Sequence, residues 1–145
     1  MEYYTQAIEL DPKDASAYKK RGSAYYELKN YDQAIKDYTK AIELNTKYHE
    51  AYNGRGNAYA ELGISNHSAG GVYALNRAID DYTQAIALYP NSSAYYHNRS
   101  TAYEAIREHG KARDDARRAC ALGDCGRLNI VYGEGSTPVR KIRRY

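Results

Sequence analysis

Apolar and small side chains recur along this chain at helical spacing and do not alternate as they would in a β-strand. Between residues 15 and 28, four such side chains follow an i, i+4, i+7 pattern, which places them on one face of a helix. These four are Tyr18, Gly22, Tyr25 and Leu28. Residues 31–44 show the same spacing at Ala34, Tyr38, Ala41 and Ile42. The pattern predicts two amphipathic helices.

The two-helix pattern itself repeats every 34 residues, with one interruption. The first-helix positions return 34 residues later as Tyr52, Gly56, Tyr59 and Leu62. The following second-helix positions return only after 44 residues, which indicates a ten-residue insert at residues 64–73. Because the insert contains Gly70-Gly71 and several polar residues, we predict a surface loop. Alternatively, Ile64, Val72 and Tyr73 within it form a small contact site.

Prolines that follow the second helices, and small residues between paired helices, support a prediction of the whole fold. Pro12 and Pro90 follow the ends of predicted second helices, because proline disfavours helix at the preceding residue. Glycine and alanine at the seam between paired helices allow close packing of the two backbones. We therefore predict an all-α fold, an α-solenoid of antiparallel helix hairpins.

This pattern resembles the tetratricopeptide repeat, a 34-residue helix-turn-helix unit. The family's order of an aromatic residue, glycine, tyrosine, alanines and proline is matched at Tyr52, Gly56, Tyr59, Ala78, Ala85 and Pro90. Arg21, Arg55 and Arg99 stand where the family has leucine. We expect the aliphatic stems of these arginines to pack while the guanidinium groups reach water. The resemblance implies a tetratricopeptide-type superhelix.

The repeat boundaries divide the chain into a repeat domain and a tail. The predicted domain covers residues 1–126, with a partial repeat at 1–14 and units at 15–48, 49–92 and 93–126. The insert 64–73 lies in the second of these units. Residues 127–145 form a basic C-terminal tail.

Composition and charge narrow the class of protein. No stretch approaches a membrane span, and Met1 is followed by polar residues without a signal peptide's apolar segment, so we predict a cytoplasmic protein. Residues 111–145 carry nine Lys and Arg against four Asp and Glu, whereas residues 1–110 carry 12 against 14. This near-neutral body disfavours nucleic-acid binding. Cys120 and Cys125 are expected to be a small core residue and a terminal thiol, and do not suggest a redox pair.

The sequence carries no motif for catalysis or for a cofactor. The four histidines are dispersed, and neither a metal-binding nor a phosphate-binding motif is present. Asp80-Asp81 and Asp114-Asp115 are adjacent pairs, so their side chains diverge along a helix, and we expect solvated carboxylates. We predict a protein that is not an enzyme and needs neither a cofactor nor a metal.

The predicted function is therefore a non-catalytic scaffold that binds a protein or peptide. In the resembled family the first helices line the concave face, where partners usually lie. First-helix residues outside the core seam give a predicted groove of Lys19, Ser23, Tyr26, Asn53, Asn57, Glu61, His97, Asn98 and Thr101. Asn53 and Asn57, one turn apart, can both donate to and accept from a peptide backbone. Groove cations are too few for a clamp on a terminal carboxylate.

Two other classes of function stay open. The first is self-assembly, because the helix carrying Tyr4, Ala7 and Ile8 lacks a first-helix partner in its own unit and leaves a face for another chain. Such a chain would be a homo-oligomer. The second is a helical-repeat RNA binder, which the near-neutral body and the single groove cation, Lys19, disfavour.

Overall fold

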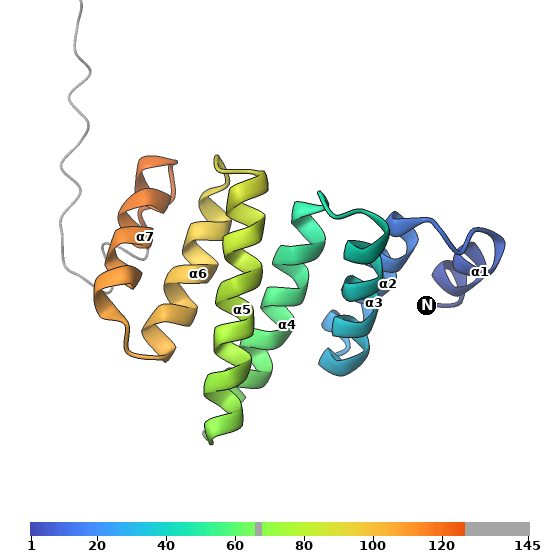
Figure 1. Cartoon of the computed structure of the whole chain (residues 1–145), viewed down its shortest axis with the longest axis horizontal. Helices are drawn as coiled ribbons and strands as arrows, with labels where there is room; N and C mark the ends of the chain where they lie inside the picture. Colours follow the sequence, from blue (N-terminus) through green and yellow to red (C-terminus); the bar gives the residue numbers. More distant parts are fainter. Residues whose placement is uncertain (66–67, 127–145) are drawn as a thin grey trace, which may run out of the picture.

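The computed structural model describes residues 1–65 and 68–126 of the chain. Within these residues it contains helices and no strand. The helices are α1 (Glu2–Leu10), α2 (Ala15–Glu27), α3 (Tyr31–Leu44), α4 (His49–Ser65), α5 (Ala69–Leu88), α6 (Ser93–Ala105) and α7 (His109–Ala121). They stand in one row from α1 to α7 (Figure 1), so the predicted all-α solenoid is confirmed. The predicted tail, residues 127–145, lies outside the described residues.

The helices pair as hairpins that stack on one another. The closest partners are α2 with α3, α4 with α5, and α6 with α7, while α3 against α4 and α5 against α6 join successive hairpins. First helices also touch each other, α2 with α4 and α4 with α6. The three first helices α2, α4 and α6 therefore share one surface of the stack.

Small residues set the distance between paired helices. Ala34, Ala78 and Ala112 of the second helices are completely buried. A Cβ atom added to Gly56 in α4 would lie 2.8 Å from Cε1 of Tyr82 in α5, closer than real contacts allow. Because these seams have no room for larger side chains, the repeat's glycines and alanines are steric requirements of the hairpin.

The insert does not form the loop that we predicted. Helix α4 runs on to Ser65 and α5 begins at Ala69, so most of residues 64–73 extend the two helices of one hairpin (Figure 1). The Ser68 side chain caps α5 by accepting a hydrogen bond from the Gly70 amide at 3.2 Å. The glycines predicted a flexible loop, but Gly71 is buried where α4 and α5 approach each other.

The repeat register shows what the insert replaces. Lys29 and Arg107 turn the other two hairpins, with left-handed φ angles of 58° and 65°. Gly63 occupies the equivalent position in the second unit but lies inside α4, buried against Leu75. Position 63 is thus a glycine, which suits a short turn because glycine adopts positive φ without steric cost.

We expect a chain lacking residues 64–73 to fold into a hairpin of ordinary length. The deletion joins Gly63 to Ala74, so Gly63 takes the turn position of Lys29, and Ala74 takes the position of the capping residue Asn30. The missing cap should cost about 1 kcal/mol, and adding Ala74→Asn should recover it. Urea denaturation of both deletion chains and the full chain measures this. A loss of several kcal/mol that Ala74→Asn leaves unchanged contradicts the prediction.

One buried ion pair joins the two helices of each of the three hairpins, which corrects our expectation of solvated guanidinium and carboxylate groups at these positions. Each arginine at the family's leucine position makes a bidentate pair with an aspartate of the following second helix, at 2.7–2.8 Å. The pairs are Arg21 with Asp37, Arg55 with Asp81, and Arg99 with Asp115. The three aspartates are 5–7% exposed. The guanidinium groups therefore meet buried carboxylates and not bulk water.

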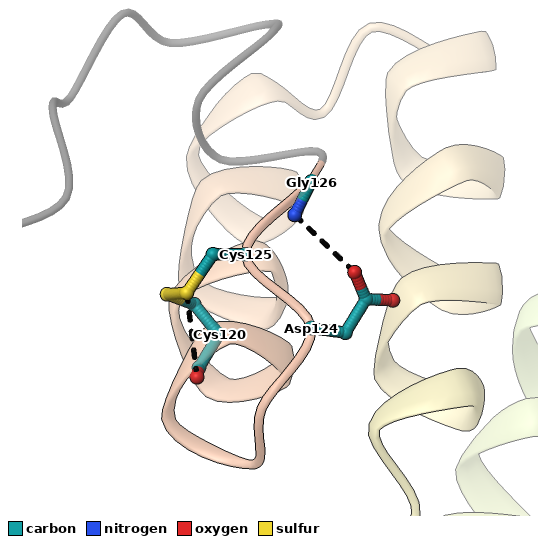
Figure 2. The surroundings of a disulfide bond; sticks show 4 residues. All are labelled: Cys120, Asp124, Cys125 and Gly126. Atoms are coloured by element: carbon teal, nitrogen blue, oxygen red, sulfur yellow. Dashed lines mark hydrogen bonds between the residues drawn. A yellow bond between two sulfur atoms is a disulfide. The ribbon is translucent and has the colours of Figure 1, made fainter.

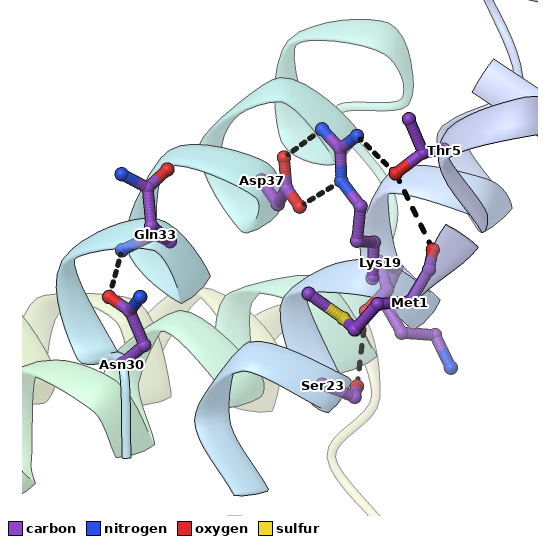
Figure 3. A network of polar contacts seen from close by, with 8 residues as sticks. Met1, Thr5, Lys19, Ser23, Asn30, Gln33 and Asp37 are labelled. Atoms are coloured by element: carbon purple, nitrogen blue, oxygen red, sulfur yellow. Dashed lines mark hydrogen bonds and ion pairs between the residues drawn. The ribbon is translucent and has the colours of Figure 1, made fainter. Parts of the chain in front are cut away.

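Each of these arginines also reaches back to the second helix of the preceding unit. The second guanidinium arm donates to a threonine hydroxyl of the previous second helix, at 3.4, 3.0 and 2.9 Å for Thr5, Thr39 and Thr83. Figure 3 shows the first of these contacts, with Thr5 and Asp37 on opposite sides of one guanidinium group. One side chain per unit thus ties three successive helices together.

Helix α1 is the second helix of the partial repeat, and it packs on α2. Ile8 is buried and Tyr4 and Ala7 are half-buried, so this predicted self-association face already contacts its own chain. The exposed apolar side chains of α1 are Tyr3 (76% exposed) and Leu10 (88%). Self-association through Tyr4, Ala7 and Ile8 stays a prediction, although the burial of Ile8 against its own chain leaves Tyr3 and Leu10 as the large apolar side chains that α1 exposes.

A disulfide closes the end of α7, where we had expected two unpaired cysteines. Cys120 in the last turn of α7 and Cys125 just beyond the helix are bonded (Figure 2). The intervening turn uses Gly123 at φ 108°, a left-handed angle that favours glycine. The separation of five residues did not predict the disulfide, because sequence spacing does not reveal that the chain reverses direction between the two cysteines.

Candidate peptide-binding groove

The surface shared by α2, α4 and α6, called here the first-helix groove, contains a cleft of about 200 Å³. Its lining residues are Tyr26, Asn57, Ala60, Glu61, Ile64, Tyr82, His97, Asn98, Thr101 and Ala102. Six of the nine groove residues expected from sequence are among them. The three first helices bring these side chains together from positions 26 to 101 of the chain because successive units stack in register.

Three asparagines along the groove hold one another in place. Asn98 of α6 donates both side-chain N–H groups to α4, to Oδ1 of Asn53 at 3.0 Å and to Oδ1 of Asn57 at 3.2 Å. The buried Tyr82 hydroxyl donates to the same Asn57 oxygen at 2.9 Å. Within the described residues, the Nδ2 donors of Asn53 and Asn57 and the Oδ1 acceptor of Asn98 make no hydrogen bond. Two donors and one acceptor are thus fixed and available to a ligand.

Tyr82 was missed by the sequence reasoning, although its spacing gave a signal. Tyr82 repeats Tyr38, whose hydroxyl lies 3.1 Å from the Ser23 hydroxyl and donates to it. Ser23 and Asn57 are themselves equivalent, 34 residues apart. In both units a second-helix tyrosine reaches across the seam to hold a groove residue. Asn57 is therefore part of the internal structure as well as of the groove.

The other two predicted groove residues on α2 lie outside the cleft. Ser23 donates to the Lys19 carbonyl oxygen at 3.1 Å and accepts from Tyr38. The Lys19 ammonium lies 5.9 Å from the centre of the Tyr48 ring, a cation–π contact. Figure 3 shows Lys19 and Ser23 next to each other on α2. Their polar groups are thus engaged with their own chain.

The charge at the cleft is negative. Burial first, and then the Glu61 carboxylate, raise the pKa of the Tyr26 phenol to about 12. Burial also raises the pKa of Tyr82, and Glu61 contributes again. His97, the one basic residue among the described residues that line the cleft, places Nδ1 3.2 Å from the Asp124 carboxylate. Any positive charge on His97 is therefore compensated by Asp124.

The described residues show neither a membrane-spanning helix nor a metal site. No helix in residues 1–65 and 68–126 has the length and apolar character needed to cross a membrane. In the same residues, no cluster of three or more His, Cys, Asp and Glu side chains could hold a metal ion.

Comparison with known proteins identifies the repeat and the fold. The family model described as "TPR repeat" matches residues 22–63, and the one described as "Tetratricopeptide repeat" matches residues 3–36. No curated protein matches the sequence.

Several solved structures share the architecture. A crystal structure of MamA superposes with a TM-score of 0.73 at 24% identity, covering 83% of this chain, and this chain spans 64% of that protein's chain. The first TPR of Spaghetti (RPAP3), bound to the HSP90 peptide SRMEEVD, gives 0.72 at 24% identity, covering 85% and 91% of the two chains. The OM64 TPR domain of Arabidopsis gives 0.67 at 28% identity, covering 75% and 82%.

Proposed function

Because this chain is a tetratricopeptide repeat protein, we propose that it is a non-catalytic scaffold that binds an extended segment of a partner protein in the first-helix groove. The observation that carries the proposal is the asparagine set on α4 and α6. An extended peptide presents carbonyl acceptors and N–H donors along its backbone. The amide donors of Asn53 and Asn57 and the acceptor of Asn98 match these groups, and their internal hydrogen bonds fix them before binding.

The similar structures provide a precedent for peptide binding and also a contrast. The RPAP3 domain, which has this fold, is bound to a peptide. In this chain Lys19 is the only Lys or Arg among the nine predicted groove residues, and its ammonium already contacts Tyr48. Since one cation compensates poorly for burying a carboxylate, the groove is poorly suited to a C-terminal carboxylate, and we propose that the ligand is an internal segment.

The test should remove the free amide donors without removing their internal bonds. Asn57→Ala is unsuitable, because it leaves the buried Tyr82 hydroxyl unpaired at a cost of about 1–3 kcal/mol. Asn53→Asp and Asn57→Asp keep the oxygen that accepts from Asn98 and replace only the donor. We expect each to weaken peptide binding about tenfold, since each loses one hydrogen bond and gains a poorly matched oxygen.

The measurement is fluorescence anisotropy with peptides selected on the wild-type protein from a displayed random library. Asn76→Asp is the matched control. Asn76 is exposed on α5, so the substitution makes the same change in charge outside the groove. It should leave affinity unchanged, and circular dichroism should show all three variants folded. Unchanged affinity in a chain carrying both Asn53→Asp and Asn57→Asp contradicts the proposed function.

A further inference from the structure

The cleft in the first-helix groove has two kinds of wall. Ala60, Ile64 and Ala102 give it an apolar side. Tyr26 and Glu61 contribute a ring and a carboxylate. Its volume of about 200 Å³ is below the roughly 300–1,000 Å³ of sites for small-molecule cofactors, so the cleft accommodates one side chain of a larger ligand.

The Glu61 carboxylate is the unbalanced charge of this cleft. Within the part of the chain that the structure describes, it makes no ion pair and accepts no hydrogen bond from a side chain. Two other carboxylates of the groove helices have partners, since Glu50 on α4 lies 3.4 Å from His49 and Glu104 on α6 lies 2.9 Å from His109. Glu61 is thus a free acceptor at the edge of a partly apolar cleft.

Two tyrosines lie within electrostatic reach of the same carboxylate, and one of them, Tyr26, lines the cleft. The Tyr26 and Tyr31 rings lie 5.5 Å apart between centroids and tilt by 55°. Burial first, and then the charge of Glu61, raises the pKa of both phenols. The negative faces of the rings and the carboxylate attract the same kind of ligand, because both stabilise a cation.

From these features we infer that the cleft is the specificity pocket for a lysine or arginine side chain of the bound segment. The aliphatic stem would lie along Ala60, Ile64 and Ala102, and the charged end would meet Glu61 beside Tyr26. The inference rests on the proposed function, because the groove asparagines hold the segment whose side chain enters the cleft. An acidic side chain would be repelled by Glu61, and a purely apolar one would leave the polar wall without partners.

The first arm of the experiment is a selection. A displayed library of random peptides with acetylated N-termini, so that no terminal amine competes, is selected on the wild-type protein. We expect one position of the selected peptides to be enriched in Lys and Arg. Selection on Glu61→Gln should lose that enrichment. Selection on Glu9→Gln, which removes the same charge from an exposed residue of α1, should keep it.

The second arm measures the coupling of the two charges. One selected peptide is made with the enriched lysine and with norleucine, which keeps the stem and lacks the ammonium. We expect the norleucine peptide to bind the wild-type protein about tenfold more weakly than the lysine peptide, because it loses both an exposed ion pair and a cation–π contact. On Glu61→Gln the difference between the two peptides should be less than twofold. Circular dichroism confirms that Glu61→Gln is folded.

The outcomes separate the inference from the proposed function. Selected peptides without basic enrichment that still lose affinity with Asn53→Asp overturn the inference and leave groove binding intact. An equal loss with norleucine on the wild-type protein and on Glu61→Gln overturns it too, because the ammonium then binds elsewhere. A library that yields no binding peptide contradicts both the inference and the proposed function.

Discussion

Replacing Asp81 by alanine is expected to destabilise the chain by about 3–5 kcal/mol. Asp81 is 5% exposed and accepts two hydrogen bonds at 2.8 Å from Arg55, whose side chain is 13% exposed. Without Asp81 the Arg55 guanidinium keeps, among the described residues, only the Thr39 hydroxyl as a hydrogen-bond partner, at 3.0 Å. An unpaired charge in this position costs several kcal/mol, far more than an exposed ion pair contributes.

The chain provides a control within the same dipeptide. Asp80 precedes Asp81 and is exposed, so Asp80→Ala should change the free energy of unfolding by no more than about 0.5 kcal/mol. The double variant Arg55→Met with Asp81→Leu should be close to the wild type, because it replaces the buried pair by apolar side chains of similar size. Urea denaturation of the four chains gives the comparison. Equal losses for Asp80→Ala and Asp81→Ala would show that Asp81 is not buried with Arg55.

Adding one methyl group at Gly63 is expected to destabilise the chain by about 1–3 kcal/mol, although the same change normally stabilises a helix. The new Cβ would lie 2.6 Å from Cγ of Leu75 and 2.9 Å from the Gly71 carbonyl oxygen. The Leu75 amide nitrogen is 3.0 Å away as well, so rotating one side chain does not relieve the clash. Helices α4 and α5 would have to separate, and overpacking of a buried contact in this way costs about 1–3 kcal/mol.

Gly110→Ala is the matched substitution. Gly110 lies in α7, and no atom of the described residues lies within 4 Å of the added Cβ, so helix propensity decides the effect. We expect Gly110→Ala to raise the melting temperature, with a gain of up to about 1 kcal/mol. Thermal unfolding followed by circular dichroism measures both variants. A Gly63→Ala chain as stable as Gly110→Ala would mean that α4 and α5 do not approach closely at the extension.

The repeat could be predicted from sequence because it depends on spacing alone. Periods of 34 and 44 residues placed the hairpins, and register placed Tyr26, Asn57, Glu61 and His97 on one surface, where they now line the cleft. This worked because stacked units repeat both the helix face and the neighbour against which it packs.

The ion pairs were missed for a reason that the same register could have revealed. Adjacent aspartates such as Asp80 and Asp81 were treated alike, although one face of a helix is buried and the next residue lies about 100° away. Arg55 and Asp81 are 26 residues apart, and the equivalent pairs Arg21–Asp37 and Arg99–Asp115 are 16 apart, the difference being the insert. Opposite charges at equivalent positions in three successive units were the available signal.

The insert could not be placed from composition. Gly70 and Gly71 suggested a loop because glycine is permissive, but a buried helix contact needs glycine for a different reason, the absence of a Cβ atom. Sequence spacing does not distinguish the two uses. Nor could the hydrogen bond from Tyr82 to Asn57 be predicted, since it depends on which groove oxygen the hydroxyl reaches.

The most direct test of groove binding is an NMR titration of the labelled full chain with a library-selected peptide. We expect the side-chain amide signals of Asn53 and Asn57 to shift on binding, together with backbone amides along the facing surfaces of α2, α4 and α6. Signals from Val72 and Tyr73, exposed on the hairpin extension, should stay in place. Shifts confined to the hairpin extension or to the second helices α3, α5 and α7, with the Asn53 and Asn57 signals unmoved, would contradict binding in the first-helix groove.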